Sequence, residues 1–585
     1  MSQVNVTIDG IKVSIDEGAT ILDAAKKAGI KIPTLCHLPE IQSIGACRMC
    51  LVEVEGSPKL QTACMCPVSE GMVVKTNTPA VLEARKFVLE LILSNHPADC
   101  FTCIRNGNCE LQELANELGL REIHYPGERI KAQVDSSNPC LIRDAEKCIL
   151  CRRCVSMCHE VQGVGVIFPQ KRGFETTIAP PFSLELRDVP CTFCGQCATI
   201  CPVGAIYEKE YIDEVWQALN DPEKFVVVQT APAIRAAIGE EFGLEVGTRC
   251  TGKLAAALRR MGFDKVFDTQ FGADLTIVEE ANELVYRIKK GGTLPMMTSC
   301  CPAWIKFVEH FYPDLLDHLS TCKSPQQMFG PIAKTYYAKK IGIPAEKMFV
   351  VSVMPCTAKK FEAERPEMRS SGFRDVDAVL TTRELARMIK QAGIDFVNLP
   401  DEEFDEPLGI STGAATIFGN TGGVMEAALR SAYEIVTGKQ LTEVEFRQVR
   451  GWKGIREADI EMDGTKVKVA VAHGLSNASF LLDRIREGSC DYHFIEVMAC
   501  PGGCIGGGGQ PVATNSNIYE IRKKRIAALY EEDKAMSVRK SHENPAIKEL
   551  YREFLGEPLG EKSHHLLHTH YTKRGATYQR EKIWV

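Results

Sequence analysis

The spacing of the cysteines constrains this chain more than any other feature. The 585 residues include 25 cysteines, and most of them fall in short, regular runs. In a small secreted protein such a number would indicate disulfides, whereas in a large chain without an export signal it favours metal-binding or catalytic thiolates. The N-terminus has no basic segment followed by an apolar stretch, and the pair Arg152-Arg153 lies mid-chain. We therefore expect a cytoplasmic protein whose cysteine runs bind metal.

Charge and hydropathy exclude two classes of partner. The chain has 69 Lys and Arg against 76 Asp and Glu, which gives a net charge of -7. A nucleic-acid-binding protein usually carries a basic surface, so nucleic acid is not expected as a partner. No run reaches the ~18 apolar residues of a membrane span, so no membrane segment is expected.

Residues 1–80 resemble a ferredoxin-like β-grasp domain. Alternating apolar residues on both sides of Asp9-Gly10 predict a β-hairpin, and a helix is expected from about Thr20. The spacing C-x10-C-x2-C-x13-C then favours a [2Fe–2S] cluster over buried structural thiols. The expected ligands are Cys36, Cys47, Cys50 and Cys64. Cys66 is not an expected ligand, because Cys64 gives the better spacing.

Residues 81–210 contain three further runs. The first is H-x3-C-x2-C-x5-C, which can bind a [4Fe–4S] cluster or, alternatively, zinc; its position between other cluster-binding segments favours the cluster. The next two runs have the spacing C-x2-C-x2-C-x3-C of bacterial two-cluster ferredoxins, in which the fourth cysteine of each run binds the other cluster. The three expected ligand sets are His96 with Cys100, Cys103 and Cys109; Cys148, Cys151 and Cys154 with Cys201; and Cys191, Cys194 and Cys197 with Cys158.

After residue 210 the pattern changes to alternating strands and helices. Buried strands are predicted within 225–235, 347–356 and 466–475, and active groups are expected on the loops that follow strands. Three later segments are rich in cysteine: TSCCPAW at 298–304, MPCTAKKFE at 354–362 and MACPGGCIGGGG at 498–509. No local spacing unites them, so their thiolates must converge in the fold.

These three segments resemble the signature segments of [FeFe] (iron-only) hydrogenases. The similarity covers residues 1–520, and residues 521–585 are similar to the separate small subunit of dimeric members of that family. The implied protein is a long multi-cluster member, similar to the catalytic subunit of NADP-reducing, electron-bifurcating-type complexes. Its implied architecture is multidomain α+β and α/β, with domains at 1–80, 81–127, 128–210, 211–520 and 521–585.

The resemblance implies an H-cluster, which is a [4Fe–4S] cube joined to a two-iron subsite with CO, cyanide and a dithiolate. Its expected ligands are Cys301, Cys356, Cys500 and Cys504, with Cys504 also bridging to the subsite. The residues expected against the subsite are Lys359, as donor to a cyanide, and Ala231, Pro232, Ser324, Gln326, Met354 and Met498. Glycines 506–509 are not followed by Lys-Ser/Thr, so they indicate close backbone approach and not a phosphate loop.

The resemblance also implies a proton path that starts at Cys300, the neighbour of ligand Cys301. Glu280 and Glu283 are three residues apart and share one face of a predicted helix. With Ser320 and Arg287 they match the family's path to the surface. Glu279 and Lys289-Lys290 are interpreted as a solvated face, and the histidines at 564, 565, 568 and 570 as an exposed, weakly ordered tail in preference to a metal site.

The implied reaction is the reversible oxidation of H₂ to protons and electrons, in an anaerobic setting. Electrons would pass through the accessory clusters to flavin- and NAD(P)-binding partner subunits or to ferredoxin, and maturation machinery would supply the two-iron unit. No nucleotide- or flavin-binding motif is evident in the chain. The alternatives are a sensory hydrogenase-like protein and a cluster-assembly or electron-transfer protein. Intact Cys300, Lys359 and both glutamates argue against them.

Overall fold

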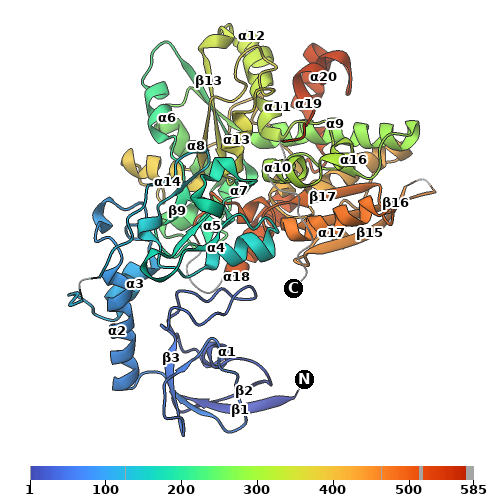
Figure 1. Ribbon diagram of the computed structural model, residues 1–585. Coiled ribbons are helices and arrows are strands. Elements are labelled where there is room, and N and C mark those ends of the chain that lie inside the picture. The colour runs from blue at the N-terminus through green and yellow to red at the C-terminus, as the bar shows by residue number, and fades with distance from the viewer. Residues whose placement is uncertain (1, 126, 463, 513–517, 575–585) are drawn as a thin grey trace.

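The computed structural model describes residues 2–125, 127–462, 464–512 and 518–574. Figure 1 shows a large body of α/β structure and a separate N-terminal domain joined to it by one long helix. This arrangement agrees with the predicted multidomain α+β and α/β architecture. Residues 575–585 of the predicted C-terminal segment lie outside the described residues. Among the described residues, no helix has both the length and the apolar character that crossing a bilayer requires.

The N-terminal domain is a five-stranded sheet of order β2-β1-β5-β3-β4 with one helix against it. The predicted hairpin forms, since Ile8 pairs with Ile11 and both Asp9 and Gly10 have positive φ, as a two-residue turn requires. A capping box between Thr20 and Asp23 begins the predicted helix. The elements are β1 (Gln3–Ile8), β2 (Ile11–Asp16), α1 (Ile21–Lys27), β3 (Leu51–Val54), β4 (Gln61–Thr62) and β5 (Val73–Lys75).

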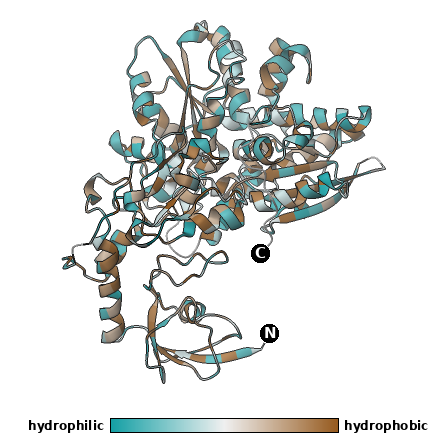
Figure 2. Cartoon of the chain, viewed as in Figure 1, coloured by the Kyte–Doolittle hydropathy of each residue, from teal (hydrophilic) through white to brown (hydrophobic). Residues whose placement is uncertain are grey.

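A long helix, α2, leads to the two-cluster region. It stands apart from the body and is largely apolar along its length (Figure 2). The two-cluster region has short elements around its cysteines, with β6 antiparallel to β9 and β7 antiparallel to β8. The segment between the N-terminal domain and this region contains α2 (Pro79–Ser94) and α3 (Glu110–Glu117). The two-cluster region contains β6 (Leu141–Arg143), α4 (Arg153–Ser156), β7 (Phe168–Gln170), β8 (Thr177–Ala179), α5 (Gln196–Thr199) and β9 (Ile206–Glu208).

The catalytic region contains two four-stranded sheets. The order of the first is β11-β10-β13-β14, and all its strands are parallel. The second has the order β12-β17-β16-β15, with only β15 antiparallel. The strands are β10 (Phe225–Thr230), β11 (Lys265–Asp268), β12 (Met296–Met297), β13 (Met348–Met354), β14 (Ala378–Thr381), β15 (Ile455–Met462), β16 (Thr465–His473) and β17 (Phe494–Met498). All three predicted strands are therefore present.

Helices surround both sheets, and the C-terminal helices pack onto the same body (Figure 1). The helices are α6 (Ile212–Leu219), α7 (Pro232–Arg235), α8 (Thr251–Arg260), α9 (Thr269–Lys290), α10 (Pro302–Phe311), α11 (Pro325–Ile332), α12 (Ala338–Ile341), α13 (Ala358–Ala363), α14 (Thr382–Gln391), α15 (Gly413–Thr416), α16 (Gly423–Thr437), α17 (Leu475–Arg486), α18 (Ile518–Ala535), α19 (Pro545–Leu550) and α20 (Glu561–Leu567).

Two sequence-based interpretations of this region are wrong. Glu279 is fully buried, because α9 packs against both α11 and the C-terminal segment, whereas Lys289 and Lys290 are exposed as expected. The histidine-rich segment is also not a loose tail, although His564, His565 and His570 are exposed as expected. His568 is buried and forms an isolated β-bridge with Cys322, and the preceding residues form α20.

Candidate active site and electron-transfer centres

The predicted site lies where the strands of both sheets end. Ala231 directly follows β10, Cys356 follows β13, and Cys500 follows β17. β12 leads into the loop with Cys300 and Cys301. Because the carboxyl ends of parallel strands meet at one edge of a sheet, loops that are distant in sequence converge here.

A cavity at this edge collects most of the predicted residues. Its lining includes Ala231, Pro232, Cys300, Gln326, Met354, Cys356, Lys359, Met498 and Cys504. Cys301 and Cys500 interact electrostatically with Cys356 and Cys504. Burial raises the pKa of the Cys356 thiol to about 12, so thiolates gathered here need a bound metal to stay ionised. The donor set therefore fits an iron–sulfur group.

Lys359 is held at this cavity by a buried carboxylate. Its Nζ donates to the Cys300 carbonyl oxygen at 3.0 Å and to Glu362 Oε2 at 2.8 Å. Burial alone would lower the pKa of Lys359, but the Glu362 carboxylate outweighs it and raises that pKa. Lys359 is therefore a fixed cation at the cavity wall.

Glu362 was missed by the sequence analysis. The hydroxyl of Ser324 and the amide of Gln326 donate to the same Oε2 atom, at 2.9 and 3.1 Å. Ser324 caps α11 and is not among the residues that line the cavity, whereas Gln326 is. The available signal was position, since Glu362 lies three residues after Lys359 and so shares its helix face.

The predicted proton-path residues form a connected series. Ser320 Oγ donates to Glu283 Oε2 at 2.7 Å, and the Arg287 guanidinium holds Glu283 Oε1 through Nε and Nη2. Glu280 has a hydrogen-bonding interaction with Ser320 and an electrostatic one with Cys300. Oε2 of Glu280 has no hydrogen-bond partner among the described residues, which suits a group that exchanges a proton.

We predict that Glu280 is protonated at neutral pH. Burial and the nearby Glu283 raise its pKa to about 8. In the unfolded chain Glu280 would lose its proton near the ordinary pKa of 4.5, whereas in the folded protein it keeps the proton up to about pH 8. The free energy of unfolding that Glu280 contributes is therefore greatest below pH 4.5 and falls progressively as the pH rises from there to 8. Infrared difference spectra should show a carboxylic-acid C=O band that titrates near pH 8 and is lost in Glu280→Gln. Glu283→Gln removes a neighbouring negative charge and should shift that titration downward; an unchanged titration would contradict the assignment.

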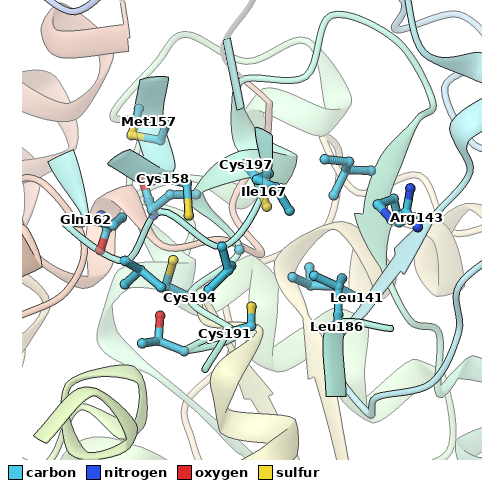
Figure 3. Close-up of a pocket in the computed structure, with 16 residues that line it drawn as sticks. Leu141, Arg143, Met157, Cys158, Gln162, Ile167, Leu186, Cys191, Cys194 and Cys197 are labelled. Carbon is cyan, nitrogen blue, oxygen red and sulfur yellow. The ribbon is translucent and has the colours of Figure 1, made fainter. Parts of the chain in front are cut away.

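The two ferredoxin runs are interleaved in the structure. One cavity is lined by Cys158, Cys191, Cys194 and Cys197, whose side chains surround it in Figure 3. A second is lined by Cys148, Cys151, Cys154 and Cys201. In each set the fourth cysteine comes from the other run. Burial raises the pKa of Cys191 to about 11 and that of Cys194 to about 12, which again fits metal-bound thiolates.

The first N-terminal set is also assembled. In the first domain Cys50 and Cys64 lie 3.4 Å apart (Sγ–Sγ), and the Cys47 amide donates to Cys36 Sγ at 3.5 Å. Cys66 instead points at the Pro67 carbonyl. In the next segment, Nδ1 of His96 is buried without a hydrogen-bond partner among the described residues, which fits a metal ligand.

Replacing His96 tests its expected role. If His96 is a cluster ligand, His96→Cys should retain a [4Fe–4S] cluster and lower its reduction potential, because a thiolate adds negative charge. EPR-monitored redox titration of the purified protein measures this change. His124→Cys is the matched control, since His124 bonds to Glu90 in the same domain and should leave the potential unchanged. An unaltered potential in His96→Cys would mean that His96 is not a ligand.

Buried side chains join neighbouring centres. Gln42 Nε2 donates to the carbonyl oxygens of Cys36 and Cys151, at 2.7 and 3.0 Å. Arg105 donates to the Cys201 carbonyl oxygen at 3.2 Å. Gln162 reaches the carbonyl oxygen of Ala499, next to Cys500, at 3.0 Å. The cysteine sets therefore follow one another from the N-terminal domain to the cavity.

The glycine run is a site of close backbone approach, as predicted. A Cβ on Gly507 would lie 2.2 Å from the Pro355 carbonyl oxygen. On Gly508 it would lie 2.5 Å from the Cys194 carbonyl oxygen. The catalytic region therefore touches the two-cluster region through bare backbone.

Comparisons with known proteins agree with this anatomy. Residues 224–508 match the family model for the iron only hydrogenase large subunit, C-terminal domain, and residues 519–574 that for the iron hydrogenase small subunit. Residues 1–79 match a 2Fe-2S iron-sulfur cluster binding domain. Residues 85–124 match the NADH-ubiquinone oxidoreductase-G iron-sulfur binding region, and residues 147–205 a 4Fe-4S dicluster domain.

Individual relatives cover most of the chain. The NADP-reducing hydrogenase subunit HndD of Solidesulfovibrio fructosivorans is 56% identical over 98% of this chain and 100% of its own length. Iron hydrogenase 1 of Clostridium pasteurianum is 45% identical over 97% of this chain and 100% of its own. A solved structure of a variant of the [FeFe]-hydrogenase HydA1 from Chlamydomonas reinhardtii superposes with a TM-score of 0.57 at 45% identity, covering 63% of this chain and 100% of that one. The chain belongs to the iron-only, or [FeFe], hydrogenase family, whose members interconvert H₂ with protons and electrons.

Proposed function

We propose that this hydrogenase is the hydrogen-activating subunit of an NADP-linked complex. The observation that carries the proposal is the cavity where Cys300, Lys359, Cys356 and Cys504 meet. Cys301, Cys356, Cys500 and Cys504 would hold the H-cluster, which supplies the two-electron chemistry of H₂ when bound. The name of the Solidesulfovibrio relative supports the NADP link.

The protein's own residues would contact the bound cluster, exclude water from it and exchange protons with it. Lys359 would present its positive charge to a cyanide ligand of the two-iron subsite. Glu362 would hold the Lys359 ammonium group in position. Met354 and Met498 would exclude water from the cavity wall. Cys300 would exchange protons with the site, and Glu280, Ser320 and Glu283 would pass them onward.

Electrons would leave the cavity along the accessory cysteine sets and pass to a partner subunit. Support for a partner near the His96 set comes from two neighbouring exposed residues, Cys100 and Phe101, the latter 95% exposed. The partner subunits would bind flavin and NADP, with ferredoxin as a further carrier. The chain has no recognisable nucleotide motif of its own.

The test is the choice of electron acceptor. We expect the purified, mature chain to reduce viologen dyes with H₂ and to leave NADP⁺ unreduced, because the nucleotide would bind to another subunit. Addition of the partner subunits should restore NADP⁺ reduction, measured by absorbance. NADP⁺ reduction by the chain alone would contradict the proposal, and the viologen assay is the internal control for hydrogenase activity.

A further inference from the structure

Helix α18 places a buried positive charge beside the cysteines of the cavity. We propose that Arg522 raises the reduction potential of the iron–sulfur cube at the cavity and so sets the energy at which electrons leave it. The inference rests on the proposed function, in which the cube is bound by Cys301, Cys356, Cys500 and Cys504. It gives the small-subunit-like segment, to which Arg522 belongs, a role in electron transfer.

Arg522 lies in the interior and forms no ion pair within the described part of the chain. The residue is 2% exposed. Its Nη2 donates to Gln196 Oε1 at 3.0 Å and to the Gly506 carbonyl oxygen at 3.4 Å, and both acceptors are neutral. A guanidinium does not lose its proton in a protein, so the buried group keeps its full positive charge. Because an isolated buried cation is strongly unfavourable, we looked for negative charge nearby.

A second arginine on the same helix shows the usual arrangement. Arg525 is also 2% exposed, and its Nε and Nη2 each donate to the Glu240 carboxylate at 2.7 Å. The groups that act electrostatically on Arg522 are instead Cys500, Tyr519 and Arg525. Burial raises the pKa of the Tyr519 phenol, so that group stays neutral, and Arg525 is itself a cation. Cys500 is therefore the source of negative charge for Arg522.

The guanidinium is fixed at the boundary between the catalytic region and the two-cluster region. Gln196, which belongs to the second ferredoxin run, accepts from Arg522 and donates through Nε2 to the Gly506 carbonyl oxygen at 2.8 Å. A Cβ on Gly506 would lie 2.7 Å from Arg522 Nε. The bare glycine therefore lets the guanidinium approach the loop that carries Cys500 and Cys504.

The cube, and not the adjoining accessory cluster, is the centre that this charge affects. Among the cysteines that the structure describes, Cys500 is the one that interacts electrostatically with Arg522. The adjoining accessory set has a cation of its own, since Lys306 Nζ donates to the Cys191 carbonyl oxygen at 2.6 Å. Arg522 is thus assigned to the cube and Lys306 to the accessory cluster.

A fixed cation shifts the potential of such a cube in one direction. Four thiolates give the cube a net negative charge, and its reduction adds one electron and no proton. A nearby guanidinium stabilises that added charge, so the reduced form is favoured and the potential rises. Unit charges about 10 Å apart at an effective dielectric constant of about 20 change each other's equilibria roughly tenfold. For one electron, a tenfold change corresponds to about 59 mV.

The experiment is an infrared redox titration of the mature enzyme at fixed pH. The CO/cyanide bands belong to the H-cluster alone, and EPR measures the accessory clusters in the same protein. Arg522→Gln should lower the H-cluster potential by roughly the equivalent of a tenfold change and leave the accessory potentials unaltered. Arg522→Lys keeps the positive charge and should restore most of the potential. Lys523→Gln is the matched control, because it removes the same charge from an exposed position on the same helix.

Three results would overturn the inference. They are an unchanged H-cluster potential in Arg522→Gln, an equal fall in Arg522→Gln and Arg522→Lys, which would indicate packing, and a fall confined to the accessory clusters. If Arg522→Gln does not mature, Arg522→Met, with an unbranched neutral side chain, takes its place in the same titration.

Cys500→Ser separates this inference from the function beneath it. If Cys500→Ser disturbs the cube while Arg522→Gln titrates like the unaltered enzyme, only the role of the charge fails. If Cys500→Ser leaves the iron content, the EPR signal of the cube and the CO/cyanide bands unchanged, Cys500 is not a ligand and the proposed function fails at its cluster site.

Discussion

Replacing Cys300 with serine should lower H₂ turnover by roughly 10²–10⁴-fold while the iron content stays the same. A serine hydroxyl has a far higher pKa than a thiol, whose ordinary value is about 8.5, so it cannot readily release and regain a proton. Burial raises the pKa of Cys300 and Glu280 raises it further, so the neutral, proton-carrying thiol is the resting form. Viologen-linked H₂ oxidation measures the loss of turnover. Iron content and the CO/cyanide infrared bands show whether the cluster is unchanged.

Its neighbour provides the control. Cys301→Ser should disturb the cube and change its EPR signal, because Cys301 is the proposed ligand of the pair. Cys300→Asp should recover part of the rate, since a carboxyl group can relay protons, and Glu280→Gln should resemble Cys300→Ser. Loss of iron in Cys300→Ser would make Cys300 a ligand and reverse the division of labour between the two cysteines.

Neutralising Glu362 should have the largest effect on stability. Glu362→Gln leaves the Lys359 cation buried without its counter-charge, and breaking a buried ion pair in this way typically costs about 3–5 kcal/mol. We expect a lower urea midpoint in protein produced without the two-iron unit, and weaker CO/cyanide bands after maturation. Lys359 would no longer be held at the cavity wall.

Two variants separate charge from packing. Glu364→Gln, near the end of the same helix, changes a half-exposed carboxylate and should cost little, as surface pairs do. Lys359→Met combined with Glu362→Gln removes both charges, so stability should recover while activity stays lost. If Glu362→Gln is as stable as the unaltered protein, the pair does not behave as a buried ion pair.

The cysteine spacing predicted much of the site because cluster geometry is local. A thiolate set such as Cys148, Cys151 and Cys154 must follow a fixed loop, and the exchange of the fourth cysteine with the other run follows from that pattern. The strand at Phe225–Thr230 was predictable for a similar reason, since a continuous apolar run in parallel sheets is buried on both faces. The convergence of Cys300, Cys356 and Cys504 came from the family resemblance, because no local spacing links them.

The errors and omissions concern polar residues whose environment depends on distant segments. Glu279 has the sequence of a solvated helix position, yet Tyr551 and His568 cover it from about 270–290 residues further along the chain. Glu362 gains its importance only when α11 brings Ser324 and Gln326 to it. Periodicity along one helix cannot report what packs against that helix.

The glycine run at 506–509 also sets the distance between the catalytic region and the two-cluster region. Where Gly508 meets the Cys194 carbonyl, two redox regions are separated by backbone alone, and even one added carbon would have to push them apart. Electron tunnelling weakens steeply with distance, so a substitution that still allowed folding would slow every electron that crosses this boundary. The glycines therefore protect the rate of a reaction in which they take no chemical part.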